Sequence, residues 1–404
     1  MYLNVVNDDG SLNRYHISKE DFFDGTLYGQ VGYIGTQAKE SNALNILKAY
    51  FSNAKAILVD NTNKVILDRL KTLNISELRE KKRDETIFDQ ENFSLMYFTS
   101  GSTGHPVAAL KTKKNIESEV SVLIDLLEKY KIKKVIVTVP FIHLYGTLFG
   151  LMFPLIKGID IVLKEHFLPH ELLNMIDDNS MVVTTPLYIK ALNKLSEKKD
   201  LSHSIFISST GPLDSENIIA FNQQYRSDII QIFGSTETGG IAYKINDDTL
   251  WKPFEYVDIS TNENNELKVN SPFVSPVLYE DRLKQTYSEI QTFDYIEQEP
   301  SGFKLIGRSS KIFKLAGKRY STIQVENILE KVDGINKALV FVELENDSLR
   351  GEYLDITLET KKAFSAKEIK KILQCNLSNL KFSIKLTIVE KIPINQIGKK
   401  LRIK

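Results

Sequence analysis

Between residues 93 and 233 the sequence alternates short apolar runs with longer amphipathic ones. This alternation predicts strand–helix–strand units and a mostly parallel sheet, because parallel neighbours need a crossover connection that is usually a helix. Helical patterns cover Asn115–Glu128 and Ser215–Gln224, and Asp214 is a good N-cap residue for the second helix. The expected strands are Phe93–Thr99, Lys134–Val139, Ile159–Leu163, Met181–Thr184, Ser204–Ser208 and Ile229–Phe233.

Small, hydroxyl and polar residues gather where these strands end. Ligands of open α/β sheets bind just beyond the carboxyl ends of the strands, so these segments are candidates for the border of one cleft. Reverse turns in any such fold use the same residue types, and that interpretation stays open here. The segments are Ser100–Gly104, Pro140–Gly146, Thr185–Pro186, Ser209–Pro212 and Gly234–Gly240.

A small β subdomain is expected after Gly240, where the pattern changes to short strands separated by turn residues. From Ser310 onward the pattern predicts a compact α+β unit, in which the capping box Ser365-x-x-Glu368 begins the second helix. The expected strands of the β subdomain are Trp251–Ile259, Glu266–Asn270, Ser288–Phe293 and Gly302–Ile306. The α+β unit is expected to have helices at Thr322–Lys331 and Ala366–Cys375 and strands at Lys337–Glu343, Tyr353–Glu359 and Ile384–Glu390.

A length of 404 residues with 42% hydrophobic residues suits two or three domains. We predict an N-terminal region over residues 1–90, a core with the β subdomain over 91–307 and a C-terminal domain over 308–404. The predicted class is α/β, with a large N-terminal domain of mostly parallel sheets and an α+β C-terminal domain. The N-terminal region has a mixed pattern, and its charged run Glu77–Glu85 fits a solvated helix or a linker.

The composition narrows the classes of function and location. Fifty-two basic residues balance fifty-two acidic ones, so no overall field draws the chain to nucleic acid or to an anionic membrane. The longest mostly apolar stretch, Tyr145–Ile156, is too short to span a bilayer, and no signal segment is present at the N-terminus, so we expect a cytoplasmic protein. Cys375, the single cysteine, excludes an internal disulfide framework and is expected to be a packing residue.

The loop after the first expected strand carries three hydroxyl residues and two glycines in a row, from Ser100 to Gly104. Glycines let backbone amides turn toward an anion, so the loop suits a polyphosphate. It is not a Walker loop, because no glycine-lysine-hydroxyl ending follows Gly104. A loop of this composition is, by itself, more often a flexible turn.

Four separated segments together resemble the AMP-forming acyl-adenylate ligases, the superfamily of acyl-CoA synthetases, firefly luciferase and peptide-synthetase adenylation domains. The match in order and spacing begins near Phe93 and runs to the last residue, whereas the first 90 residues do not match and form a shortened N-terminal region. The matching segments are Phe98–Pro106, Phe233–Glu237, Thr292–Asp294 with Gly307-Arg308, Gly317–Arg319 and Glu326, and Pro393–Arg402.

The resemblance implies that ATP and Mg²⁺ convert a carboxylic acid to an acyl-adenylate with release of pyrophosphate. Lys399 would bridge the substrate carboxylate and the α-phosphate, although a lysine so near the chain end is ordinarily solvated. Glu237 would hold Mg²⁺. The alternative interpretation of Glu237 is a structural carboxylate at the start of a helix. His143 would shape the acid pocket, although a histidine at a strand end is often merely hydrogen-bonded.

The resemblance also implies a nucleotide-binding set. The loop would hold the triphosphate together with Thr236, and Phe233 would stack on adenine where relatives usually have tyrosine. Asp294 and Arg308 would bind the ribose hydroxyls, against the alternative of a surface ion pair. The set is Thr99, Ser100, Gly101, Ser102, Thr103, Gly104, Gly211, Pro212, Phe233, Gly234, Thr236, Asp294 and Arg308.

In such enzymes the C-terminal domain swings about a hinge, presenting Lys399 for the first half-reaction and the loop around Gly317 for the second. Two positions depart from the family pattern. Ser310 stands at the hinge in place of Asp or Lys, and Val107 stands where the phosphate loop normally continues with lysine. Nearby lysines that are candidates for the missing charge are Lys111, Lys113 and Lys114.

No aspartate occurs in Phe141–Gly146, where amino-acid adenylating enzymes pair with a substrate ammonium, so an aryl or fatty acid is favoured. The acceptor would be the thiol of CoA or the phosphopantetheine of a separate acyl carrier protein, since no carrier domain is fused. Two alternatives remain: an amino-acid adenylating enzyme, and a non-catalytic adenylate-binding regulator. Val107 favours the regulator, whereas the combination of Lys399 with Glu237 and the ribose-binding pair argues against it. An oxidoreductase is excluded by the lack of a Gly-x-Gly-x-x-Gly turn.

Overall fold

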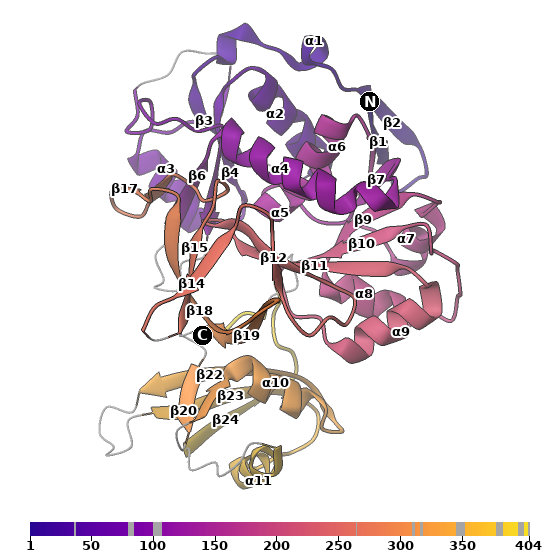
Figure 1. The fold of residues 1–404 in the computed structure, drawn as a ribbon, viewed down its shortest axis with the longest axis vertical. Helices are drawn as coiled ribbons and strands as arrows, with labels where there is room; N and C mark the ends of the chain where they lie inside the picture. Colours follow the sequence, from indigo (N-terminus) through magenta and orange to yellow (C-terminus); the bar gives the residue numbers. More distant parts are fainter. Residues whose placement is uncertain are drawn as a thin grey trace. The chain divides into compact units, whose positions relative to one another are not determined.

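The computed structural model divides the chain into two compact units (Figure 1). Unit 1 comprises Met1–Ile259 and Val269–Ile290, and unit 2 comprises Ser260–Lys268 and Gln291–Lys404. The residues that the structure describes are 1–35, 38–79, 85–99, 107–263, 265–308, 312–315, 318–344, 352–376, 383–394 and 400–402.

Unit 1 contains a nine-stranded sheet whose six middle strands are parallel, as the alternating pattern predicts. An antiparallel strand is added at one edge, and two more are added at the other. In spatial order the strands are β13 (Lys252–Pro253), β12 (Gly239–Ile245), β11 (Asp228–Ser235), β10 (Ile205–Ser208), β9 (Ser180–Thr184), β7 (Lys134–Val137), β8 (Asp160–Leu163), β1 (Tyr2–Val6) and β2 (Leu12–His16).

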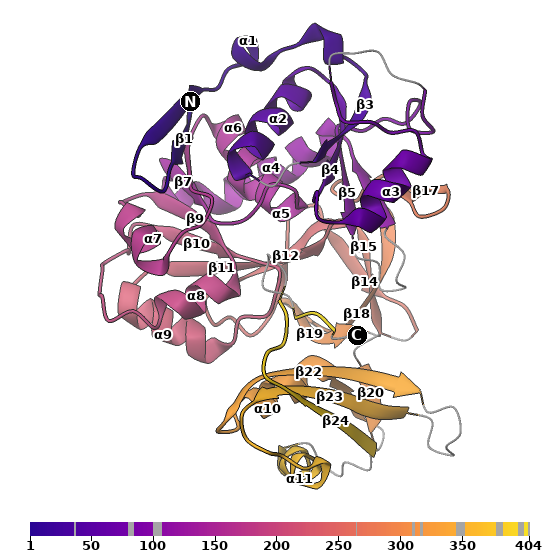
Figure 2. The same ribbon diagram turned by 180° about the vertical axis from the view of Figure 1, so that it is seen from behind.

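Helices cover this sheet because each has an apolar face to bury. α9 (Ser215–Tyr225), α8 (Pro186–Leu192) and α7 (Pro169–Met175) pack on the middle strands (Figure 2), with Phe206 and Phe221 in the shared core. Asp214 caps α9 by accepting the Asn217 amide, as predicted. The remaining helices near this sheet are α4 (Lys113–Leu127), η2 (Glu128–Tyr130), α5 (Leu144–Thr147), η3 (Leu148–Met152) and α6 (Phe153–Lys157).

A second, six-stranded sheet of unit 1 carries the predicted phosphate loop. Its strands β3, β4 and β5 are parallel, whereas β6, β16 and β17 are antiparallel to their neighbours. The order is β17 (Leu283–Gln285), β16 (Val277–Tyr279), β6 (Val107–Lys111), β5 (Leu95–Thr99), β4 (Lys55–Val59) and β3 (Val31–Gly35). The first 90 residues thus supply strands to both sheets, together with α1 (Lys19–Phe22), η1 (Gly25–Leu27), α2 (Lys39–Phe51) and α3 (Lys64–Thr72).

The predicted single strand Trp251–Ile259 is wrong. The chain forms β13, then a turn, and then β14 (Asp258–Thr261), which belongs to a different sheet. Tyr256 adopts a left-handed backbone conformation (φ 64°), which a continuous strand cannot contain. β12, which begins at Gly239, also joins the large sheet rather than a small subdomain. Most of the charged run Glu77–Glu85 lies outside the described residues.

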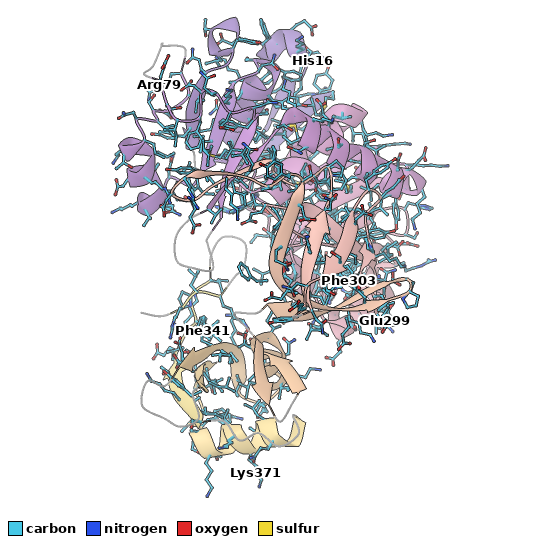
Figure 3. The ribbon with its side chains drawn as sticks, turned by 60° about the vertical axis from the view of Figure 1, so that its left-hand side comes forward. His16, Arg79, Glu299, Phe303, Phe341 and Lys371 are labelled. Atoms are coloured by element: carbon cyan, nitrogen blue, oxygen red, sulfur yellow. The ribbon has the colours of Figure 1, made fainter. Side chains whose placement is uncertain are left out.

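The expected β subdomain is a four-stranded sheet in the order β14, β15 (Glu266–Asn270), β18 (Glu289–Glu299) and β19 (Gly302–Arg308). Phe303 on β19 is fully buried, and the Glu299 carboxylate, at the end of β18, accepts a hydrogen bond from the Lys304 ammonium (Figure 3). A two-stranded pair follows, β20 (Ile312–Leu315) with β21 (Lys318–Ser321).

The last part of unit 2 is the predicted α+β fold. A three-stranded sheet of β22 (Ile335–Leu344), β23 (Glu352–Thr360) and β24 (Ser383–Val389) packs against α10 (Thr322–Glu330) and α11 (Ala366–Asn376). The capping box is confirmed, because Ser365 and Glu368 exchange two side-chain-to-amide hydrogen bonds. Cys375 lies in α11, as expected. No helix in the described part of the chain has the length and apolar run that crossing a bilayer requires.

Candidate active site

The predicted phosphate loop connects two paired antiparallel strands. β5 ends at Thr99, β6 begins at Val107, and these two residues are paired in the ladder. The loop residues Ser100, Gly101, Ser102, Thr103 and Gly104 lie outside the described residues, so their phosphate contacts stay a prediction.

A tight turn carries Thr236 and Glu237 between β11 and β12. The Ser235 amide donates to Thr238 Oγ1 (3.0 Å), and the Thr238 amide donates back to Ser235 Oγ (3.1 Å). The turn follows the carboxyl end of a parallel strand, where ligands of such sheets bind. Glu237 therefore lies in a turn between two strands, and the alternative of a helix-start carboxylate is wrong.

An aromatic pair adjoins this turn. The ring of Phe233 lies 5.4 Å from that of Trp251, with the planes tilted by 49°. The Lys244 ammonium lies over the Trp251 ring, 5.1 Å from its centre. Sequence reasoning gave Phe233 an adenine-stacking role but missed Trp251, the single tryptophan of the chain.

Gly211 and Pro212, two members of the predicted nucleotide-binding set, are exposed in the segment that follows β10. β10 is the parallel neighbour of β11, which carries Phe233. Ser209 donates its hydroxyl to the Ile232 carbonyl (3.0 Å) and so ties the two strand ends together. The structure thus brings these residues to one edge of the sheet, as the sequence predicts.

His143 precedes α5 and belongs to a segment packed over neighbouring strand ends. The hydroxyl of Tyr145 lies within hydrogen-bonding distance of the Thr184 carbonyl (2.9 Å) and the Ile207 carbonyl (2.8 Å), at the ends of β9 and β10. Burial lowers the pKa of His143, and the nearby Asp60 carboxylate opposes that change only in part. The imidazole is therefore neutral near pH 7. Tyr145 was missed, although it lies in the same motif as His143.

Of the three candidate lysines, Lys111 is the one that reaches the Glu237 turn. Its ammonium donates to the Phe273 carbonyl (2.6 Å) and to the Glu237 carbonyl (3.4 Å), and its side chain is 1% exposed. Burial lowers the pKa of Lys111 below its ordinary value, although the Glu119 and Glu237 carboxylates oppose the shift. Lys113 instead bonds to Asn53 Oδ1, and Lys114 is exposed.

The predicted ribose-binding pair lies on adjacent strands of unit 2. Asp294 on β18 is directly opposite Arg308, the last residue of β19, in the antiparallel register. The Asp294 side chain is 5% exposed, and its amide donates to Thr292 Oγ1 (3.1 Å). The structure thus brings the two residues together, which their separation in the sequence does not reveal.

The predicted catalytic Lys399 lies outside the described residues, as do Gly317 and Ser310. The described residues on either side of Lys399 are close together, because Ile394 and Lys400 form an antiparallel bridge. Glu326, part of the predicted C-terminal motif, accepts hydrogen bonds from the Val340 amide (3.0 Å) and from Lys400 Nζ (2.9 Å).

The described residues contain no cluster of three metal-ligating side chains. Mg²⁺ does not require one, since it is commonly held by one or two carboxylates together with substrate phosphates and water. A partly exposed carboxylate on the turn after β11 fits that ligand set, so Glu237 is compatible with the predicted metal role.

Residues 35–272 match the AMP-binding enzyme family. The chain belongs to this family. Among its relatives is the 2-succinylbenzoate–CoA ligase of Listeria monocytogenes, which is 26% identical over 325 residues covering 76% of this chain and 68% of the relative. The 3,4-dihydroxybenzoate–[aryl-carrier protein] ligase of Bacillus anthracis is 23% identical over 307 residues, which cover 73% of this chain and 71% of the relative.

The fold agrees with solved structures of similar proteins. The O-succinylbenzoate CoA synthetase of Bacillus subtilis, in complex with its acyl-adenylate intermediate, has a TM-score of 0.80 at 17% identity, with 98% of this chain and 94% of that chain covered. The same enzyme in complex with ATP and a magnesium ion has a TM-score of 0.78. The predicted α/β class and the predicted AMP-forming ligase activity of this AMP-binding enzyme are thereby confirmed.

Proposed function

We propose that this AMP-binding enzyme activates an aryl or fatty carboxylic acid with ATP and transfers the acyl group to the thiol of CoA or of a separate carrier protein. The observation that carries the proposal is the Glu237 turn at the carboxyl end of β11, with the Phe233–Trp251 aromatic pair beside it. An acidic side chain and aromatic rings are what Mg²⁺-bound phosphates and a nucleotide base require. Two relatives are named for benzoate derivatives, which favours an aryl acid.

In the proposed site each group of residues binds one part of the substrates. Glu237 would hold Mg²⁺, which when bound neutralises charge on the triphosphate. Thr236 and the Thr99–Gly104 loop would contact phosphate oxygens, Phe233 would stack on adenine, and Asp294 with Arg308 would hold the ribose. Lys399 would stabilise the charge that develops as the carboxylate attacks the α-phosphorus and pyrophosphate leaves.

The acid pocket is proposed beside His143 and Tyr145. A neutral imidazole offers hydrogen-bonding capacity without a charge, which suits an uncharged aryl or acyl chain. The segment Phe141–Gly146 contains no carboxylate to pair with a substrate ammonium, which disfavours an α-amino acid. A cytoplasmic location and the absence of nucleic-acid partners stay predictions.

The test is acid-dependent release of pyrophosphate with ATP, Mg²⁺ and a panel of aryl, fatty and amino acids. Lys399→Ala should lower the rate by about a hundredfold or more, since removing an electrostatic stabiliser typically has that effect. Lys371→Ala is the matched control, because Lys371 is exposed on α11 (Figure 3) and should leave the rate unchanged.

No acid-dependent pyrophosphate from the wild type would refute the ligase. Tight ATP binding without turnover would instead support the adenylate-binding regulator, and turnover with amino acids alone would support the amino-acid alternative. Repeating the active case with CoA and with a phosphopantetheinylated carrier protein identifies the acceptor.

A further inference from the structure

The backbone of the Glu237 turn is held by donors from outside the turn. The Glu237 carbonyl accepts from the Lys111 ammonium (3.4 Å) and from the Ser275 amide (2.9 Å). Lys111 is the last residue of β6, the strand that leaves the predicted phosphate loop. One buried side chain therefore links that strand to the turn that carries the proposed metal ligand.

A buried carboxylate holds the far end of the same turn. Glu119 on α4 is 4% exposed, and its Oε1 accepts from the Gly240 amide (2.7 Å). Gly239 lets this carboxylate approach, because a Cβ at Gly239 would lie 2.8 Å from Glu119 Oε2. Lys111 thus holds the turn at Glu237, and Glu119 holds the start of β12 at Gly240. The opposite charges of the two side chains stabilise each other.

The segment after β15 is held by the same two elements. Asn115, in the first turn of α4, donates its side-chain amide to the carbonyls of Pro272 (2.7 Å) and Val274 (3.2 Å). Lys111 bonds to the carbonyl of Phe273 between them. β6 and α4 therefore fix the Glu237 turn and its supporting segment through polar side chains rather than through packing alone.

Two buried charges at this place need a physical reason. Apolar residues of similar volume often stabilise a core as well as buried opposite charges do, so stability alone does not account for an ammonium and a carboxylate here. What a charged side chain provides is a directed hydrogen bond to a chosen backbone atom, which sets the position of that backbone.

We propose that Lys111 and Glu119 are positioning residues that fix the Glu237 turn against β6, the strand that leaves the phosphate loop. The Glu237 carboxylate, which would bind the metal, is then held at a fixed position relative to the loop that would bind the triphosphate. This inference rests on the proposed function, in which Glu237 holds Mg²⁺ on ATP. It assigns no direct contact with substrate to either residue.

The test compares how much Mg²⁺ strengthens the binding of a non-hydrolysable ATP analogue, measured by isothermal titration calorimetry with and without the metal. The variant K111M/E119Q removes both charges together, so that neither is left buried and unpaired. We expect it to keep the wild-type melting temperature within a few degrees and to lose about tenfold or more of the Mg²⁺ enhancement, the usual effect of losing a residue that orients a metal ligand.

Lys39→Met is the matched control. Lys39 is also a buried lysine, 7% exposed, whose ammonium bonds to two backbone carbonyls, those of Thr138 and Lys164. The same chemical change at that site should lower stability without changing the Mg²⁺ enhancement. If the double variant does not fold, Lys111→Met alone removes the bond to the Glu237 carbonyl and should still lose part of the enhancement.

Wild-type enhancement in a folded K111M/E119Q or in a folded Lys111→Met would overturn the positioning role while leaving the proposed function intact. A wild-type protein that binds no ATP analogue would overturn the proposed function, and the positioning role with it. Loss of enhancement in Lys39→Met equal to that in the double variant would show a general effect of destabilisation and would also overturn the inference.

Discussion

Lys400→Met should destabilise the end of unit 2 by about 2 kcal/mol. Lys400 donates to Glu326 Oε2 (2.9 Å), to Glu330 Oε1 (2.5 Å) and to the Ala338 carbonyl (2.7 Å). Burial alone would lower the pKa of Lys400, but the two carboxylates raise it above its ordinary value, so the ammonium is held across neutral pH. Methionine keeps the apolar stem and removes all three bonds.

The magnitude follows from how far the partners are buried. The Glu326 side chain is 10% exposed and that of Lys400 is 23% exposed. Breaking a fully buried pair costs roughly 3–5 kcal/mol, whereas an exposed pair contributes at most about 1 kcal/mol. This partly buried network lies between those limits. A loss of about 2 kcal/mol corresponds to roughly 30-fold faster hydrogen exchange at the amides that become exposed only when this part of the structure unfolds.

The assay is hydrogen–deuterium exchange of the β22 and β23 amides, read by mass spectrometry. Lys371→Met, an exposed change on α11, is the control and should leave exchange within about twofold of the wild type. Adding Glu330→Gln to each background gives a double-mutant cycle that isolates the Lys400–Glu330 pair. Unchanged β22–β23 exchange in Lys400→Met would refute the reasoning that this network anchors the chain end.

Three further outcomes are expected. ATP binding should change the fluorescence of the protein, because Trp251 is its single tryptophan and lies 5.4 Å from Phe233; a spectrum unaffected by saturating ATP would contradict adenine binding there. Burial lowers the pKa of Lys39 to about 8, below its unfolded value, so the unfolded state binds more protons and stability should rise between pH 8 and 10.5. That rise, on the order of 3 kcal/mol, should be missing from Lys39→Met in denaturation curves compared at the two pH values. Gly234→Ala should lower the melting temperature, because a Cβ at Gly234 would overlap the Gly239 carbonyl oxygen; an unchanged melting curve would show that the turn adapts at no cost.

The middle parallel strands β7, β9 and β10 could be predicted because they are apolar runs whose side chains are buried on both faces. β9 is an example, since every one of its residues is buried. The parallel strands β1, β3 and β4 of the first 90 residues were not predicted. The failure at Trp251–Ile259 has a local cause. The apolar and aromatic residues there are typical of a strand, but the left-handed backbone conformation of Tyr256 divides the segment. Tyrosine rarely adopts that conformation, so the sequence does not predict it.

The candidate site was predictable only as far as its short motifs extend. Phe233 and Glu237 share one motif, and the sequence placed them correctly at the end of a strand. Lys111 was noticed only as a charge near the loop, because a lysine at a strand end usually lies in solvent. Its acceptor, the Phe273 carbonyl, is 162 residues away along the chain, and only the folded structure brings the two together.

The C-terminal motif that ends at Arg402 could be recognised in the sequence, but the contacts that explain its arginine could not be predicted. The Arg402 guanidinium bonds to Glu343 (2.7 Å) and Asp355 (3.1 Å) and lies 4.6 Å from the centre of the Phe341 ring on β22 (Figure 3). These contacts fix the chain three residues after the predicted catalytic Lys399, and Lys400 fixes it one residue after. The pattern Gly-Lys-x-x-Arg therefore combines two requirements, a lysine assigned to chemistry and an arginine that holds the chain end to β22 and β23. Only the second can be derived from the described contacts, so variants of Arg402 should alter stability and rate together, whereas Lys399→Ala should alter rate alone.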